Sequence, residues 1–72
     1  MRIYTTWMAY NGEVGITHSG DYYEMSTGKQ MQRCEHQGSL YYRVLGSKKR
    51  YSYRKCNKTK IKQRVEVVIM PF

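Results

Sequence analysis

Residues 3–16 read IYTTWMAYNGEVGI, a stretch in which Asn11-Gly12 lies between two runs of alternating side chains. An Asn-Gly pair in this setting is the strongest local signal for a β-hairpin, because both central positions of a type I′ turn need a positive φ. The turn also sets the register, which is Ala9 opposite Val14, Trp7 opposite Ile16, Thr5 opposite His18 and Ile3 opposite Gly20. The expected core face of this hairpin carries Ile3, Trp7, Ala9, Val14 and Ile16.

A second hairpin is expected around Gly46-Ser47, which suits a type II′ turn between residues 39–45 and 48–56. Its register would pair Val44 with Lys49, Tyr42 with Tyr51, and Leu40 with Tyr53. These six residues share one face, which is mostly apolar and aromatic and should pack on the core. The opposite face would carry Tyr41, Arg43, Arg50 and Arg54 among serines.

The remaining segments also favour strands. Residues 61–70 alternate as a last strand, and residues 22–25 fit a short strand followed by a Ser26-Thr27-Gly28 turn. Residues 29–37 fit either a strand or a two-turn helix that Gly38 would cap. Residues 1–72 are therefore expected to form a single small basic β domain.

The predicted fold class is all-β. We expect a small curled antiparallel sheet or partial barrel of five to seven short strands, with one short helix near residues 29–37 as the alternative to a strand there. The expected core consists of Ile3, Trp7, Val14, Ile16, Leu40, Tyr42, Val44, Tyr51, Tyr53, Val65, Val67 and Ile69.

The charge of the chain is concentrated in one half. Residues 1–38 hold three basic and four acidic residues, a net of −1, whereas residues 39–72 hold ten basic and one acidic, a net of +9. Nine of the seventeen residues from 48 to 64 are Lys or Arg, and none is acidic. Self-repulsion in such a cluster opposes folding, and a polyanionic partner relieves it. Nucleic acid, either RNA or DNA, is the commonest such partner.

Basic side chains interleaved with an aromatic on a sheet face can hold phosphates and stack a base. The candidate nucleic-acid-binding residues are Tyr41, Arg43, Lys48, Lys49, Arg50, Arg54, Lys55, Lys58, Lys60, Lys62 and Arg64. The competing interpretation of this face is a solvated surface whose Lys and Arg prevent edge pairing and keep the domain soluble.

The expected function is non-catalytic nucleic-acid binding. The alternative is a small inhibitor or accessory protein, of the type that viruses and mobile elements encode, which binds an acidic host protein or a nucleic-acid-bound enzyme. The oligomeric state stays open, with a dimer among the options. The two partners would be separated by competition, because nucleic acid displaces a protein partner only if both use the same face.

Other chemistry finds little support in the sequence. No motif fixes any pair of the five carboxylates and two histidines into a catalytic arrangement, so we expect neither enzyme activity nor a cofactor. Cys34, His36, Cys56 and His18 do not follow a zinc-binding spacing. No apolar run is long enough to span a bilayer or to serve as a signal peptide, so a cytoplasmic protein with free thiols is expected. A Cys34–Cys56 disulfide stays open only for an exported protein.

Overall fold

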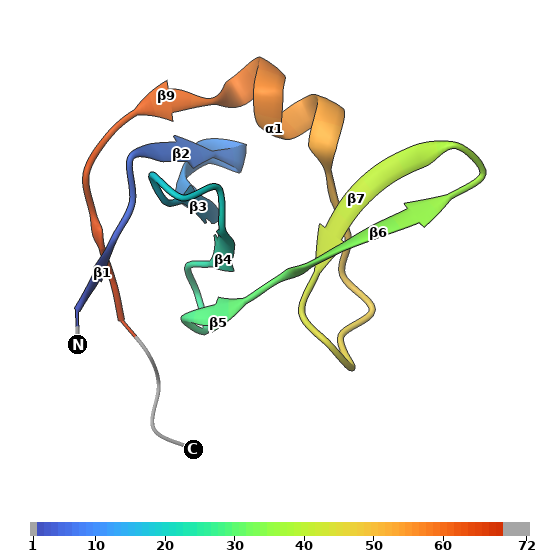
Figure 1. Cartoon of the computed structure of the whole chain (residues 1–72), viewed down its shortest axis with the longest axis horizontal. Helices are drawn as coiled ribbons and strands as arrows, with labels where there is room; N and C mark the ends of the chain where they lie inside the picture. The colour runs from blue at the N-terminus through green and yellow to red at the C-terminus, as the bar shows by residue number, and fades with distance from the viewer. Residues whose placement is uncertain (1, 69–72) are drawn as a thin grey trace.

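The computed structural model describes residues 2–68, and within them ten short strands form three antiparallel sheets beside one α-helix (Figure 1). The fold is therefore all-β, as the sequence predicts, with one short helix that lies elsewhere than the one considered, and the sheets do not close into a barrel. The strand number exceeds the predicted five to seven because several expected strands are interrupted. Residues 29–37 form two strands instead of one, and so do residues 3–9 near the N-terminus and residues 61–67 near the C-terminus.

The largest sheet has five strands in the order β5-β4-β3-β2-β9. These strands are β2 (Trp7–Ala9), β3 (Val14–Ile16), β4 (Tyr22–Glu24), β5 (Lys29–Gln30) and β9 (Ile61–Lys62). The register of β2 with β3 is confirmed, with Trp7 opposite Ile16 and Ala9 opposite Val14.

The turn of the first hairpin has the predicted geometry. Asn11 and Gly12 have φ of 53° and 91°, and the Glu13 amide donates to the Tyr10 carbonyl at 3.1 Å. These residues also form a short 3₁₀ turn, η1 (Tyr10–Gly12). Turn chemistry alone was therefore sufficient to fix this register.

The outer pairs of that hairpin, Thr5 with His18 and Ile3 with Gly20, were predicted wrongly. Strand β1 (Ile3–Tyr4) pairs instead with β10 (Glu66–Val67), so that Ile3 lies opposite Val67. The buried Thr5 hydroxyl binds the C-terminal segment, since it donates to the Gln63 carbonyl at 2.8 Å and accepts from the Val65 amide at 2.9 Å. These long-range bonds direct the N-terminal segment away from β3.

The three-stranded sheet contains β6 (Gln32–His36), β7 (Ser39–Arg43) and β8 (Tyr51–Ser52). Tyr42 lies opposite Tyr51, as predicted. The strand expected over residues 48–56 is nevertheless limited to Tyr51–Ser52. Residues 48–50 belong to the loop, where the Ser47 amide donates to the Val44 carbonyl at 2.9 Å, so the expected Gly46-Ser47 turn and the Val44–Lys49 pair are not formed. Beyond Ser52, helix α1 (Tyr53–Thr59) begins. The Ser52 hydroxyl caps α1 by accepting from the Lys55 amide, so Tyr53 cannot pair with Leu40.

Residues 29–37 form strands, and the helix considered for them is absent from the structure. Gln37 and Gly38 both have positive φ, of 51° and 80°, and they turn the chain between His36 and Ser39. Gly38 is thus a turn residue and not a helix cap. The strand at residues 22–24 and the turn after it are confirmed, because the Gly28 amide donates to the Glu24 carbonyl at 2.8 Å.

The core lies between the two larger sheets and the inner face of α1. It contains Ala9, Val14, Ile16, Tyr22, Met31, Tyr42, Val44, Tyr51 and Cys56. The rings of Tyr22 and Tyr42 stack with their centroids 3.8 Å apart. Half of the predicted core is buried, and the exceptions are of three kinds. Tyr53 is 36% exposed because it begins the helix, and Ile69 lies outside the described residues. Four others are only partly buried: Ile3, Trp7, Leu40 and Val65.

Candidate functional site

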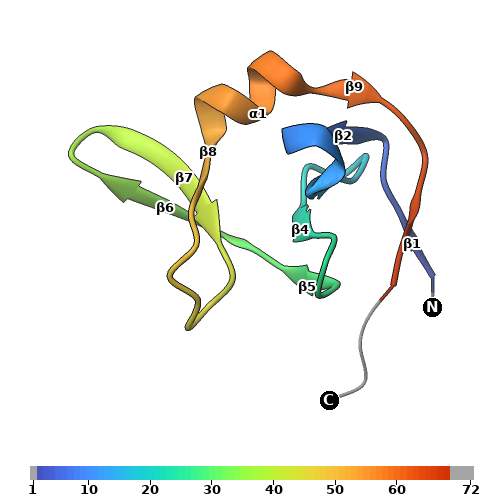
Figure 2. The same cartoon turned by 180° about the vertical axis from the view of Figure 1, so that it is seen from behind.

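One continuous edge of the molecule carries six cations. Helix α1 runs directly into β9, and Figures 1 and 2 show the two following the rim of the fold above β2. Cys56 faces the core from the helix and is fully buried, which leaves the other helix faces to charged residues. We call this edge the helix ridge; it consists of Arg54, Lys55, Lys58, Lys60, Lys62 and Arg64, all exposed.

Three cations of the helix ridge lie over aromatic rings from the N-terminal part of the chain. The Lys55 ammonium lies 4.7 Å from the Tyr10 ring centroid, and that of Lys60 lies 5.0 Å from the Trp7 ring. The Arg64 guanidinium lies 4.3 Å from the Tyr4 ring. Each contact contributes about 0.5–1 kcal/mol at an exposed site. The contacts hold the long side chains in place while they remain accessible to a ligand.

The other predicted site residues lie in and beside the loop that joins β7 to β8. Lys48, Lys49 and Arg50 belong to that loop, and Tyr41 and Arg43 belong to β7; we call these five residues the loop cluster. The Arg50 guanidinium covers the Tyr41 ring at 4.8 Å. The loop projects on the side of β8 that is remote from α1 (Figures 1 and 2). The structure thus divides the predicted cationic face into two surfaces.

The two surfaces differ in how far their charge is compensated. Within residues 2–68 there are two ion pairs, Arg2 with Glu66 at 3.7 Å and Lys49 with Glu13 at 2.9 Å. The bond to Glu13 raises the pKa of Lys49. In the loop cluster the charge of Lys49 is therefore compensated by Glu13, whereas no described carboxylate pairs with any cation of the helix ridge.

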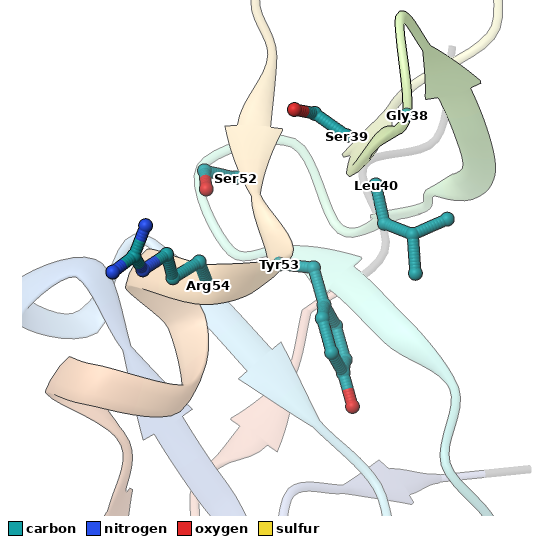
Figure 3. Close-up of a pocket in the computed structure, with 6 residues that line it drawn as sticks. All are labelled: Gly38, Ser39, Leu40, Ser52, Tyr53 and Arg54. Atoms are coloured by element: carbon teal, nitrogen blue, oxygen red, sulfur yellow. The ribbon is translucent and has the colours of Figure 1, made fainter.

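A small hollow lies where the β6-β7 hairpin meets the start of α1. It is lined by Gly38, Ser39, Leu40, Ser52, Tyr53 and Arg54 (Figure 3). The Leu40 side chain and the Tyr53 ring point the same way, and Arg54 points away from them. The hollow thus combines the apolar Leu40 and Tyr53 with two serines and a cation of the helix ridge.

Of the aromatic residues beside the cations, the sequence predicts only Tyr41. It places Tyr53 and Trp7 in the expected core, and it does not connect Tyr4, Trp7 or Tyr10 with the basic segment. The Ser52 cap is the one local signal that could have placed Tyr53 on a helix. The other three contacts depend on pairing between distant segments, so no local pattern marks them.

Glu24 and Cys56 are buried and have structural roles. The buried Glu24 carboxylate accepts from the Tyr51 hydroxyl at 3.1 Å and from the Thr27 hydroxyl at 2.9 Å. Both cysteines are free thiols, and burial raises the pKa of Cys56 to about 11. No three His, Cys, Asp or Glu side chains converge into a metal site within residues 2–68. Over the same range no helix has the length and apolar character needed to cross a membrane.

Comparison of the chain with protein-family models, curated proteins and solved structures finds no match. The class that the fold and the site define is a small all-β protein with a cationic, aromatic-backed ridge.

Proposed function

We propose that the protein binds nucleic acid without catalysing a reaction on it, and that the helix ridge holds the phosphate backbone. The observation that carries this proposal is the run of six exposed cations between residues 54 and 64, none of which has a carboxylate partner in the described chain. Phosphates would supply the missing counter-charges and relieve the repulsion within the ridge.

The length of the helix ridge suits several phosphates. Six residue steps at helical rise from Arg54 to Lys60 span about 9 Å, and four extended steps to Arg64 add about 13 Å. One strand of B-form DNA carries a phosphate about every 3.4 Å along its axis, and the spacing along the strand itself is longer, so the path of about 22 Å passes several phosphates and at most roughly six. The six cations set the same upper limit on the number of contacts.

Stacking would favour a single strand over a duplex. The hollow beside Arg54 offers the Tyr53 ring, which is partly exposed and lies next to the ridge. Tyr41 offers a second ring, one face of which Arg50 covers. A base stacked on an aromatic side chain contributes about 1–3 kcal/mol, and bases in a duplex are already stacked on each other.

The test is fluorescence anisotropy with single- and double-stranded DNA and RNA at a series of salt concentrations. Six phosphate contacts predict a slope of log K against log salt near −4 for single strands and near −5 for a duplex, at about −0.7 and −0.9 per contact. Absence of binding at low salt to all four ligands, or binding that does not change with salt, would contradict the proposal. An acidic protein surface would then be the partner to test.

Paired charge reversals locate the interface. The double variant Lys58→Glu/Lys62→Glu alters the helix ridge, and Lys29→Glu/Lys48→Glu makes the same charge change on β5 and in the loop cluster. All four lysines are exposed, so both variants should fold. The first should weaken binding by at least tenfold more than the second, because it removes phosphate contacts as well as net charge. Equal losses would show that only net charge matters.

A further inference from the structure

The β6-β7 hairpin leaves one edge of its sheet unpaired. It extends from the body of the molecule in both views (Figures 1 and 2). Within residues 2–68, β6 pairs only with β7 and stands at the end of the order β6-β7-β8. Four of its five residues are exposed, and Cys34 is intermediate. An open edge of this kind can accept another strand.

The turn determines which residues of β6 can bond outward. A two-residue turn at Gln37-Gly38 makes His36 and Ser39 a hydrogen-bonded pair. Hydrogen-bonded pairs alternate along an antiparallel ladder, so Gln32 and Cys34 also direct their backbone groups toward β7. Arg33 and Glu35 direct theirs toward the open edge.

Arg33 and Glu35 are also the two charged residues of the strand. Both are exposed, and they share one face of β6 because side chains two positions apart point the same way. The two ion pairs of the described chain involve neither of them. The open edge thus presents a positive and a negative side chain on either side of Cys34, each without an ion-pair partner among residues 2–68.

We propose that β6 pairs with β6 of a second copy, antiparallel and centred on Cys34. Outward backbone groups must meet outward groups, which allows three registers: Arg33 opposite Arg33, Glu35 opposite Glu35, or Arg33 opposite Glu35. The first two place like charges directly across the strands, which is destabilising. The third gives four backbone hydrogen bonds and two Arg–Glu pairs about a twofold axis, so charge complementarity selects it.

The interface is small and mostly polar, so the dimer is weak and depends on protein concentration. It goes beyond the proposed function, because it concerns a surface that the helix ridge does not use. If both hold, the dimer carries two ridges, and a nucleic acid that spans both would be bound more tightly than by one copy.

Cys34 provides a covalent readout of the register. Centred on the axis, the two Cys34 residues form a non-hydrogen-bonded pair with Cα atoms about 4.5 Å apart, within reach of a disulfide. Diamide would oxidise them: each thiol loses its proton, the two sulfurs give up two electrons in forming the S–S bond, and diamide takes up both protons and both electrons. Cys56 is fully buried and should not crosslink.

The decisive experiment combines crosslinking with charge reversal at β6. The wild-type protein should form a diamide-dependent dimer that Cys34→Ser abolishes. Arg33→Glu and Glu35→Arg should each slow crosslinking by roughly tenfold, because each places like charges across the strands. The double variant Arg33→Glu/Glu35→Arg should restore it. An equimolar mixture of the two single variants should also restore it as a heterodimer, since one copy then brings two acids and the other two bases.

Melting curves of each variant establish that it folds, and sedimentation under reducing conditions over a range of protein concentrations measures the dimer without the disulfide. The proposal is overturned if the wild-type protein stays monomeric in both assays. It is equally overturned if the single charge reversals crosslink as fast as the wild type, or if their mixture crosslinks no faster than either alone. Crosslinking insensitive to these charges would indicate random collision of exposed thiols.

Discussion

Replacing Tyr51 by Phe should destabilise the protein through a single lost hydrogen bond. The Tyr51 hydroxyl donates to Glu24 Oε2 at 3.1 Å, and both side chains are buried, at 2% and 8% exposed. Phe keeps the ring and its edge-to-face contact with Tyr10 at 5.1 Å, so packing is preserved. Glu24 would keep only the Thr27 hydroxyl as a side-chain donor in the described structure.

The magnitude follows from the charge of the acceptor. A hydrogen bond to a charged group contributes about 1.5–3 kcal/mol, and a buried acceptor left without its donor bears the cost of desolvation. A chain of this length has a total stability of about 4–11 kcal/mol, at roughly 0.05–0.15 kcal/mol per residue. The substitution should therefore remove a large fraction of it. Tyr51→Ala, which also removes the ring, should cost about 3 kcal/mol or more.

Urea unfolding monitored by circular dichroism measures the change as a shift of the midpoint at constant slope. Tyr53→Phe is the matched control, because Tyr53 is 36% exposed and its hydroxyl has no hydrogen-bond partner in the described structure; its effect should stay within about 0.5 kcal/mol. If Tyr51→Phe also costs less than about 0.5 kcal/mol, the Glu24 carboxylate does not depend on this donor and the reasoning is wrong.

Three further predictions concern packing, pH and stacking. Gly15→Ala should cost about 1–3 kcal/mol in urea unfolding, because a Cβ there would lie 2.6 Å from the Cγ2 of the hydrogen-bonded Thr5 and 2.5 Å from the Met25 sulfur. Stability should fall as pH rises from 9 to 11, by about 2 kcal/mol from Cys56 alone. The pKa of Cys56 in the folded protein is about 11 and exceeds the ordinary value of 9.0, so ionisation of this thiol favours the unfolded chain. Cys56→Ala should flatten this part of the pH profile, whatever the substitution costs at neutral pH. Tyr53→Ala should weaken binding to single strands by about 1–3 kcal/mol and hardly change duplex binding or the salt slope. Tyr41→Ala and Tyr41→Phe test the Tyr41 ring in the same way. Equal losses of binding to single strands and to duplexes would indicate a structural role for the ring.

Turn chemistry and alternation predicted two of the local strand pairings. Asn11-Gly12 fixed the register of β2 with β3, whereas the Tyr42–Tyr51 pair forms although the expected Gly46-Ser47 turn does not. The helix was missed because the aromatic alternation of Tyr51 and Tyr53 resembles a strand, whereas the deciding feature is the Ser52 cap. The Gln37-Gly38 turn was missed because a residue other than Gly, Asn or Asp is uncommon at positive φ.

The long-range part of the fold has no local signal. Pairing of β1 with β10 joins residues more than sixty positions apart, and two of the three Thr5 bonds beside it depend on one hydroxyl. The candidate site likewise has a part that the sequence predicts and a part that depends on long-range pairing. Charge counting selected the cations, but only the folded chain places Tyr4, Trp7 and Tyr10 beneath three of them.

That arrangement makes Trp7, the single tryptophan of the chain, a reporter of the helix ridge. The Lys60 ammonium lies 5.0 Å from the centre of its ring, so a phosphate that draws Lys60 away changes the field at the indole. Nucleic acid should therefore change the tryptophan emission in a saturable way, and added salt should reverse the change as binding weakens.

Lys60→Met should remove most of this change and lower the salt slope by about one contact, or roughly 0.7–0.9. Lys48→Met removes the same charge from the loop cluster and should leave the emission change intact, because Lys48 lies in the β7-β8 loop, outside the ridge. An emission change of equal size in the Lys60→Met protein would mean that the ligand reaches Trp7 by another route. A change lost in Lys48→Met and kept in Lys60→Met would place the phosphates on the loop cluster, and would move the interface from α1 and β9 to the β7-β8 loop.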